Sequence, residues 1–476
     1  MSIRIIYDAT HVLQEGTNPP VGITRVEHYV AEYLITQTAN AVHFVHFDPA
    51  TNRYVEATPA EDLLIRRYLL HRYQADDHEP IAADPPKPPP LDAGHFAVNL
   101  SNMFETRLAI PANWPAILRL PLGVIRGAAY RCIRAMHATL RIIARADAAV
   151  RGRDSGENEI EQRSEFEWQE SDALIALSNL WDYMDYEYLF TLKTRFGIKI
   201  ITIVYDVIAL IYPYSTYAST DLYHRHWVEI AHACTNIVAI SQETARTYQK
   251  YILDPNHLKA QVSVATLPNF LKDRAGDIGV QPIAELVDKK FVVYCSTIEA
   301  RKNHQTLIHV WERLIEDLDL DSVPILIFVG RWGWGFETVQ RMYERCWRLR
   351  PKLQIRERVT DSELIWLYKN AIFTAFPSLA EGFGLAAAES LSFGTPVITS
   401  SCAALSEATE GLMPGIDPLD VPEWTRVIEN LLLDEGAIAT LRQRATQFRG
   451  ADYAAFARTV LCLALSEGRS EHSCAG

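Results

Sequence analysis

Short apolar runs rich in β-branched residues alternate with stretches of helical apolar spacing along most of this chain. The first such run, residues 3–7, is followed by a glycine-containing loop and then by helical spacing over residues 23–35. This alternation is typical of α/β proteins, in which helices cover a mostly parallel sheet. A first series of strands is predicted at residues 3–7, 42–47, 173–177, 199–205, 236–240 and 261–265.

A second series begins near residue 288. Its strands are predicted at residues 291–295, 324–329, 353–357, 372–375 and 396–399. Two successive series indicate two doubly wound domains, each of which binds ligands at the carboxyl ends of its strands. We therefore predict an N-terminal Rossmann-like domain over residues 1–280, a C-terminal one over residues 281–465 and a tail over residues 466–476.

The strand–helix rhythm is interrupted between about residues 75 and 168, which we interpret as a helical insertion into the N-terminal domain. Within it, residues 111–153 hold eight arginines and a single acidic residue. A helix over residues 119–145 would gather five of these arginines on one side, opposite apolar residues. This pattern is typical of a helix that lies on an anionic membrane surface. A helix packed on the domain with a solvated basic face, or one that recognises an acidic glycan, is the alternative.

Composition excludes several other classes. The formal net charge of −13 argues against general nucleic-acid binding, because phosphates repel an acidic protein. The seven cysteines include no Cys-x-x-Cys pair, which disfavours a zinc ribbon or disulfide framework and fits a reducing compartment. We see neither a signal peptide nor an apolar stretch of membrane-spanning length. We therefore expect a cytoplasmic protein, which the basic helix would hold at the inner face of the plasma membrane.

The densest chemical signal runs from residue 377 to residue 389. A strand is followed by a loop with Gly382 and Gly384, and a helix is expected to begin at Leu385. Glycines let backbone amides approach a ligand, and the positive end of a helix dipole suits a phosphate. Glu381 in the loop and Glu389, expected two turns into the helix, could accept sugar hydroxyls. The alternative is an ordinary loop glutamate and a surface helix glutamate.

This segment resembles the glutamate-x7-glutamate motif of family 4 retaining glycosyltransferases, the glycosyltransferase group 1 family. Residues 298–303 resemble that family's Glu-Pro-Arg-Lys-Asn loop, and residues 359–368 its acidic, Glu-Leu segment. Gly394-Thr-Pro-Val-Ile and Glu407 extend the match, which is dense over about residues 288–420. The resemblance implies the GT-B fold, with two Rossmann-like domains and an interdomain cleft.

The resemblance also implies roles for individual residues. Arg301 and Lys302 would bind the donor diphosphate, a task that suits permanent charges with several donors. Glu381 would contact the donor sugar and Glu389 the nucleotide ribose. The donor would also be approached by the loop backbone at Gly382, Phe383, Gly384 and Leu385. Ser296 or Thr297 stands where some relatives carry a further arginine, so more of the diphosphate binding would rest on the remaining groups.

The N-terminal domain would supply the acceptor side. Gly22-Ile-Thr-Arg25 resembles the family's first glycine loop, which faces the donor phosphates. Residues 203–206 resemble a segment in which many relatives have His-Asp, but Tyr205 replaces the histidine. A phenol is a weaker base than an imidazole at neutral pH. Asp206 remains as a catalytic candidate that orients an acceptor hydroxyl or stabilises positive charge at the anomeric carbon. A helix cap or turn residue is an equal alternative.

The reaction implied by the resemblance is metal-independent transfer of a hexose from a nucleotide-diphosphate sugar to a saccharide, with retention of configuration. We expect no resident cofactor and no metal; the Asp-x-Asp run at residues 317–321 is interpreted as a solvated turn, and His11, His43 and His46 as too isolated to form a metal site. The sequence looks most like mannosyl- or rhamnosyltransferases of bacterial glycan clusters. We therefore favour GDP-mannose as donor and a lipid-linked saccharide as acceptor, in surface polysaccharide or O-antigen (lipopolysaccharide) synthesis. A GT-B nucleotide-sugar 2-epimerase and a catalytically idle nucleotide-binding scaffold are the alternatives.

Overall fold

The computed structural model describes residues 3–15, 23–38, 42–48, 51–70, 165–215 and 220–466. Both sheets and nearly all described residues belong to one compact unit, formed by residues 1–76, 165–217 and 226–476. Of the other unit, residues 77–164 and 218–225, only the start of one helix is described. Of the insertion predicted over about residues 75–168, only residues 165–168 are described. The basic helix at 119–145 and the tail beyond residue 466 lie outside the described residues.

Within the described ranges, the first sheet has seven strands in the order β3-β2-β1-β4-β5-β6-β7. All of its neighbouring pairs are parallel except β2 and β3, which are antiparallel. The strands are β1 (Arg4–Asp8), β2 (Val42–Asp48), β3 (Arg53–Glu56), β4 (Asp172–Ala176), β5 (Lys199–Val204), β6 (Asn236–Ala239) and β7 (Gln261–Val264). The helices are α1 (Thr10–Glu15), α2 (Ile23–Gln37), α3 (Pro59–Leu70), α6 (Tyr186–Phe196), α7 (Ile208–Ile211), α8 (Thr220–Ala233), α9 (Gln242–Tyr248), α10 (Phe270–Asp273) and α11 (Ala275–Ile278).

The second sheet has six parallel strands in the order β10-β9-β8-β11-β12-β13. The strands are β8 (Phe291–Cys295), β9 (Ile325–Val329), β10 (Leu353–Arg356), β11 (Thr374–Phe376), β12 (Val397–Ser400) and β13 (Gly415–Ile416). The helices in this part of the chain are α12 (His304–Asp317), α13 (Glu337–Arg345), α14 (Asp361–Asn370), α15 (Leu385–Ser392), α16 (Ala403–Ala408), α17 (Val421–Leu433), α18 (Glu435–Ala445) and α19 (Tyr453–Leu465).

Every strand predicted from the sequence is present, with ends that differ by one or two residues. Two short strands were not predicted. β3 is an edge strand of four residues, and β13 has only two. Such short segments carry too few side chains to show a period of two.

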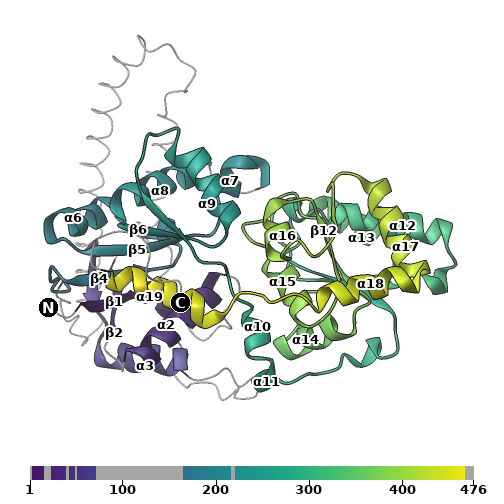
Figure 1. The fold of residues 1–476 in the computed structure, drawn as a ribbon, viewed down its shortest axis with the longest axis horizontal. Coiled ribbons are helices and arrows are strands. Elements are labelled where there is room, and N and C mark those ends of the chain that lie inside the picture. Colours follow the sequence, from purple (N-terminus) through teal and green to yellow (C-terminus); the bar gives the residue numbers. More distant parts are fainter. Residues whose placement is uncertain are drawn as a thin grey trace, which may run out of the picture. The chain divides into compact units, whose positions relative to one another are not determined.

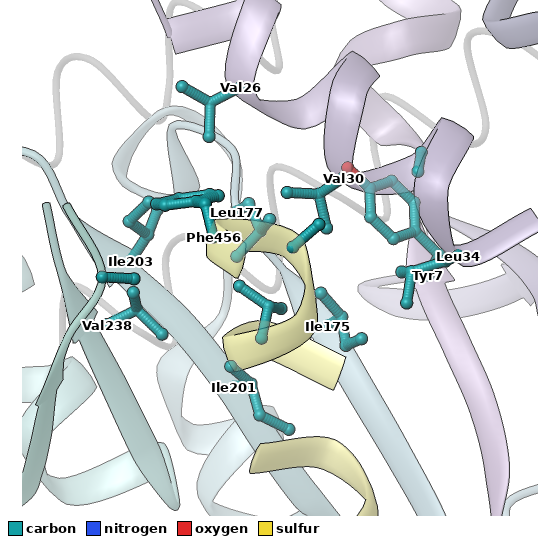
Figure 2. Packing of buried hydrophobic residues seen from close by; sticks show 14 of the residues in the cluster. Tyr7, Val26, Val30, Leu34, Ile175, Leu177, Ile201, Ile203, Val238 and Phe456 are labelled. Carbon is teal, nitrogen blue, oxygen red and sulfur yellow. The ribbon is translucent and has the colours of Figure 1, made fainter. Parts of the chain in front are cut away.

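The C-terminal helix α19, yellow in Figure 1, returns to the first sheet and packs against α2, β4 and β5. Its buried residues Phe456, Val460 and Ala464 recur every four positions and so form one face of the helix. Phe456 lies among strand residues such as Ile203 and Val238 (Figure 2). Burying a Phe or Val side chain stabilises the fold by about 1.5–3 kcal/mol. The first sheet therefore depends on α19, the last of the described helices, for part of its core.

Local signals fix the ends of several helices near the site. α14 begins with a capping box, in which Thr360 accepts from the Glu363 amide and the Glu363 side chain accepts from the Thr360 amide. Ser241 caps α9 by accepting from the Thr244 amide at 2.9 Å. These caps hold the loops that precede the helices at the carboxyl ends of the strands.

No helix among the described residues combines the length and the apolar character needed to cross a membrane.

Candidate active site

Two cations follow β8, a central strand of the second sheet. Arg301 and Lys302 lie in a single 3-10 turn, Ala300–Lys302, directly before α12. Asn303 ends the turn with a left-handed backbone, φ 56°. Its side-chain amide donates to the carbonyls of Pro377 (3.0 Å) and Pro418 (2.8 Å). The turn is thereby tied to the loop that follows the neighbouring strand β11.

Glu381 lies in that β11–α15 loop and meets both cations. Lys302 Nζ lies 2.7 Å from Oε1 and 2.8 Å from Oε2 of Glu381. Arg301 donates to Glu381 Oε2 at 3.0 Å, to the Ala380 carbonyl at 2.7 Å and to Glu299 Oε1 at 2.5 Å. All three side chains are mostly buried: Glu381 is 9% exposed, Arg301 17% and Lys302 16%. The structure therefore brings together three of the residues predicted from the sequence.

Glu381 and Arg301 are ionised at neutral pH. Burial alone would raise the pKa of Glu381, but the charges of Lys302 and Arg301 outweigh it and hold the pKa at about 2. Burial alone would lower the pKa of Arg301, but Glu381 and then Glu299 raise it above its ordinary value. The two side chains therefore offer charged hydrogen-bond donors. Such donors bind phosphoryl oxygens as they bind carboxylates.

The loop then passes directly into α15. The helix begins at Leu385, as predicted, and its N-cap Gly384 has φ 112°, where a side chain would be strained. A Cβ on Gly384 would also lie 2.6 Å from the Leu405 side chain. The first amides of a helix have no partner within it, and they carry the positive end of its dipole. The turn between β11 and α15 is therefore closely packed, and the N-terminus of α15 at its end is electropositive.

Glu389 is the fifth residue of α15, so it lies one turn into the helix rather than the two turns that we predicted. It is buried, which excludes the alternative of a surface glutamate. Tyr368 donates to its Oε2 at 3.3 Å, and Arg25 lies 3.9 Å from its Oε1. Burial raises the pKa of Glu389 to about 7, although the charge of Arg25 opposes this.

Arg25 is the third residue of α2 and the last residue of the Gly22-Ile-Thr-Arg25 segment. It also donates to both oxygens of Asp361, at 3.1 and 3.2 Å. Asp361 begins α14 and was given no role from the sequence. Gly22 itself lies outside the described residues, so the proposed donor contact at that residue stays a prediction.

Tyr205 and Asp206 directly follow β5, and they differ in their environment. The Tyr205 hydroxyl donates to the Leu177 carbonyl at 3.0 Å, and burial, followed by the charge of Glu27, raises its pKa well above the ordinary value. Tyr205 is therefore no base at neutral pH. Asp206 Oδ1 accepts from the Ile208 amide at 2.9 Å, so it is a turn residue. Its charge also contributes to the raised pKa of Arg301, which places its carboxylate near the cationic cluster.

The backbone of Gly382 is held from the first sheet. Its carbonyl accepts from Ser241 Oγ at 2.6 Å and from Thr244 Oγ1 at 3.0 Å. A Cβ at this position would meet the Tyr205 carbonyl oxygen and lie 3.1 Å from Asp206 Cβ. This contact of Ser241 has no local signal in the sequence, because its partner is 141 residues away in the chain.

Phe383 is buried in the hydrophobic core of the first sheet, together with residues such as Ala265 and Leu267. Its side chain therefore has a packing role beside the ligand role proposed for its amide. Within the described ranges, no group of three or more His, Cys, Asp or Glu side chains is arranged to hold a metal ion.

Residues 280–448, which carry this cluster, match the family model described as Glycosyl transferases group 1. The chain contains a glycosyl transferases group 1 domain. The strand–loop–helix turn with Glu381 and Glu389 and the turn with Arg301 and Lys302 both lie inside this domain.

Two relatives of the group 1 domain come from Escherichia coli. The serotype-specific mannosyltransferase WbdA is 30% identical over 214 residues, which is 44% of this chain and 26% of WbdA. The O-antigen chain mannosyltransferase B is 32% identical over 168 residues, which is 34% of this chain and 43% of that protein. The match thus spans about a quarter of the length of WbdA and less than half of the length of mannosyltransferase B.

The architecture around the group 1 domain is the GT-B fold, as predicted. The N-terminal domain of Candida albicans trehalose-6-phosphate phosphatase superposes on 98% of this chain and 97% of its own, with a TM-score of 0.55. The sequence identity is 12%, so this likeness concerns the fold alone.

Proposed function

We propose that this protein is a retaining, metal-independent glycosyltransferase, which moves a hexose from a nucleotide-diphosphate sugar to a saccharide hydroxyl. The observation that carries the proposal is the convergence of Arg301 and Lys302 on Glu381, beside the first turn of α15. Glycosyl transfer builds negative charge on the leaving diphosphate and positive charge at the anomeric carbon. A site for it needs cations and a carboxylate close together, and this cluster supplies both.

Arg301, Lys302 and the first amides of α15 would bind the diphosphate. These groups would neutralise the charge that develops as the bond between the sugar and the phosphate breaks. Glu381 would accept hydrogen bonds from the donor sugar. Fixed charges in a mostly buried site act with little reorganisation, which favours the transition state over the ground state.

Glu389 would accept from the ribose hydroxyls of the nucleotide. It is buried, and its neighbours Tyr368 and Arg25 hold its two oxygens. The backbone at Gly382, Phe383, Gly384 and Leu385 would line the path from the sugar to the phosphates. Asp206 would orient the acceptor or stabilise charge at the anomeric carbon.

We also propose GDP-mannose as the donor and a lipid-linked saccharide as the acceptor, in surface polysaccharide or O-antigen synthesis. The names of the two Escherichia coli relatives support mannose and the O-antigen. A cytoplasmic location, with the 119–145 helix on an anionic membrane, completes the proposal. The arginine-rich composition of that segment supports it.

The test begins with thermal unfolding in the presence of GDP-mannose, UDP-glucose, dTDP-rhamnose and ADP-glucose. A ligand that binds only the folded protein raises the unfolding midpoint by mass action. We expect one nucleotide class to raise the midpoint of the wild type, with and without a chelator, and to raise that of Lys302→Met much less. Arg348→Ala is the matched control, because Arg348 forms an ion pair with Glu316 and is 54% exposed.

Transfer to a mannoside acceptor is then followed by proton NMR, which reads the anomeric configuration of the first product. Retention supports the proposal, whereas inversion contradicts it. Release of a free 2-epimer from the donor would favour the epimerase. Binding of a nucleotide without transfer or hydrolysis would favour the idle scaffold.

A further inference from the structure

A pair of tyrosines follows α7, the short helix that begins just after Asp206. Asp206 Oδ1 accepts from the Ile208 amide at 2.9 Å, at the start of the helix. The Tyr212 amide donates to the Ile208 carbonyl at 2.7 Å and so closes the single turn. The rings of Tyr212 and Tyr214 have centroids 6.0 Å apart, and their planes stand at 89°. The pair is therefore tied to Asp206 by one closed turn of helix.

The two rings differ in their exposure. Ile208 is buried and anchors α7, whereas the side chain of Tyr214 is 69% exposed. Tyr212 is half-buried, and burial, followed by the neighbouring Tyr214 phenol and Cys402 thiol, raises the pKa of its hydroxyl. A tyrosine offers a large, rigid contact face and loses little conformational entropy when a ligand covers it. Tyr214 thus presents such a face at the end of an anchored turn.

The pair lies near the loop that carries Glu381. A Cβ at Gly382 would lie 3.1 Å from Asp206 Cβ, so the residues that begin the α7 turn pack against this loop. Cys402, a neighbour of Tyr212, is also a neighbour of Glu381: burial raises the pKa of its thiol, and the charge of Glu381 is among the further causes. The backbone contact and the position of Cys402 both place the tyrosines on the side of the site where the donor sugar is proposed to bind.

Two aromatic rings at right angles suit a pyranose. Its axial C–H groups form an apolar face that stacks on the π face of a ring, while its hydroxyls point outwards to water or to a phenol. The second ring of the pair offers its edge to the same sugar. The proposed donor is held by residues of the group 1 domain, whereas α7 belongs to the first sheet. A sugar at the tyrosines is therefore part of the acceptor.

The length of α7 indicates which part of the acceptor this is. Its four residues rise by about 6 Å, which is about the length of one sugar unit. An acceptor hydroxyl oriented by Asp206 and a ring stacked on Tyr214 would therefore belong to neighbouring sugar units. A monosaccharide that occupies the position at Asp206 would leave Tyr214 uncovered.

We propose that Tyr214, with Tyr212 beside it, forms a subsite for the second sugar unit of the acceptor, counted from the unit that carries the attacking hydroxyl. This inference rests on the glycosyltransferase function proposed above. It narrows the acceptor to a chain of at least two neutral pyranose units. Tyr214 is a specificity-determining residue, which binds the acceptor and takes no part in the bonds that form and break.

Binding to the full-length protein is measured first, because it needs no turnover. The probes are methyl α-mannoside and an α-linked mannobiose, each with the nucleoside diphosphate that raises the unfolding midpoint. Saturation-transfer NMR gives the Kd of each probe. We expect the wild type to bind the mannobiose about tenfold more tightly, and Tyr214→Ala to lose this preference. Tyr214→Phe keeps the ring and should keep the preference.

Two controls separate the subsite from other effects. Tyr214→Ala should leave the nucleotide-induced shift of the unfolding midpoint unchanged, because other residues hold the donor. Trp347→Ala is the matched variant, since Trp347 is 73% exposed and precedes β10, at the amino-terminal edge of the second sheet. It should keep the preference for the mannobiose.

Equal affinities of the wild type and Tyr214→Ala for the mannobiose overturn the proposal. Loss of the preference in Tyr214→Phe does so as well, because it would assign the contact to the hydroxyl rather than the ring. The same holds if the wild type binds the nucleotide but shows no preference for the mannobiose.

Exposed tyrosines also occur where proteins meet a membrane surface, which phosphatidylglycerol vesicles test. Loss of vesicle binding in Tyr214→Ala, with unchanged affinity for the mannobiose, would assign the pair to a membrane and overturn the proposal. Absence of any nucleotide-induced shift in the wild type is a different result, which overturns the proposed function itself.

Discussion

Lys302 Nζ lies within 2.8 Å of both carboxylate oxygens of Glu381, although the two residues are 79 positions apart in the chain. The lysine thus bridges the loops that follow the neighbouring strands β8 and β11. In a protein that binds a diphosphate here, the phosphate would share this lysine with the carboxylate. The pair holds the cation in place before the donor arrives, which lowers the cost of ordering its side chain on binding.

The first prediction concerns the cations. Lys302→Met keeps the length of the side chain and removes the charge, and a hydrogen bond to a charged group contributes about 1.5–3 kcal/mol. We expect the Kd of the nucleoside diphosphate to rise by about 10- to 100-fold, as measured by calorimetry. The wild type should also lose more affinity than the variant between low and high salt. Unchanged affinity in Lys302→Met, with Arg348→Ala as reference, would remove the lysine from the phosphate site.

The second prediction concerns the stability of the Glu381 cluster in acid. The pKa of Glu381 is about 2 in the folded protein, below its ordinary value near 4.5. A depressed pKa contributes stability that is present above pH 4.5 and lost as the pH falls towards 2. We expect the stability advantage of the wild type over Glu381→Gln to fall over this range, by on the order of 3 kcal/mol.

Urea unfolding at several pH values measures this difference. Glu423→Gln serves as control, because Glu423 pairs with Arg426 on the surface, where such a pair contributes little. A constant difference between the wild type and Glu381→Gln from pH 5 to pH 3 would contradict the prediction.

The sequence allowed the strands and the start of α15 to be predicted because these features have local causes. Runs of β-branched residues and the Gly384–Leu385 turn can be recognised within a few positions. The partners of Glu381 could not be derived in this way, since they depend on the order of β8 and β11 in the sheet. Only the resemblance to a family placed Arg301 and Lys302 near it.

Two features were missed for the same physical reason. His11 was interpreted as isolated, because nothing in the local sequence shows that Glu27 reaches it from α2. The burial of Glu389 was not foreseen, since its neighbours in α15 are mostly alanines and give no clear apolar stripe. In both cases a carboxylate, Glu27 or Glu389, has a partner that comes from another element of the fold.

The third prediction concerns the fit of the loop. In Gly382→Ala, the new methyl group would meet the Tyr205 carbonyl oxygen, a backbone atom that cannot turn aside. We expect the free energy of unfolding to fall by about 1–3 kcal/mol. The transfer rate should fall by more than the loss of folded protein explains, because Glu381 moves with the loop. Gly276→Ala in α11 is the control. No atom lies within 4 Å of its Cβ position, so it should leave both quantities nearly unchanged.

The last prediction concerns Glu389, whose pKa burial raises to about 7. A raised pKa contributes stability below pH 4.5 that is lost as the pH rises through 7, so the wild type should lose stability relative to Glu389→Gln between about pH 5 and pH 8. Donor binding should show the opposite trend. Ribose hydroxyls donate to the ionised carboxylate, so donor affinity should rise as Glu389 ionises, and that of Glu389→Gln should stay flat. Calorimetry with the nucleoside diphosphate across this range measures both proteins. Parallel pH profiles for the two would mean that Glu389 does not titrate there or does not contact the ribose.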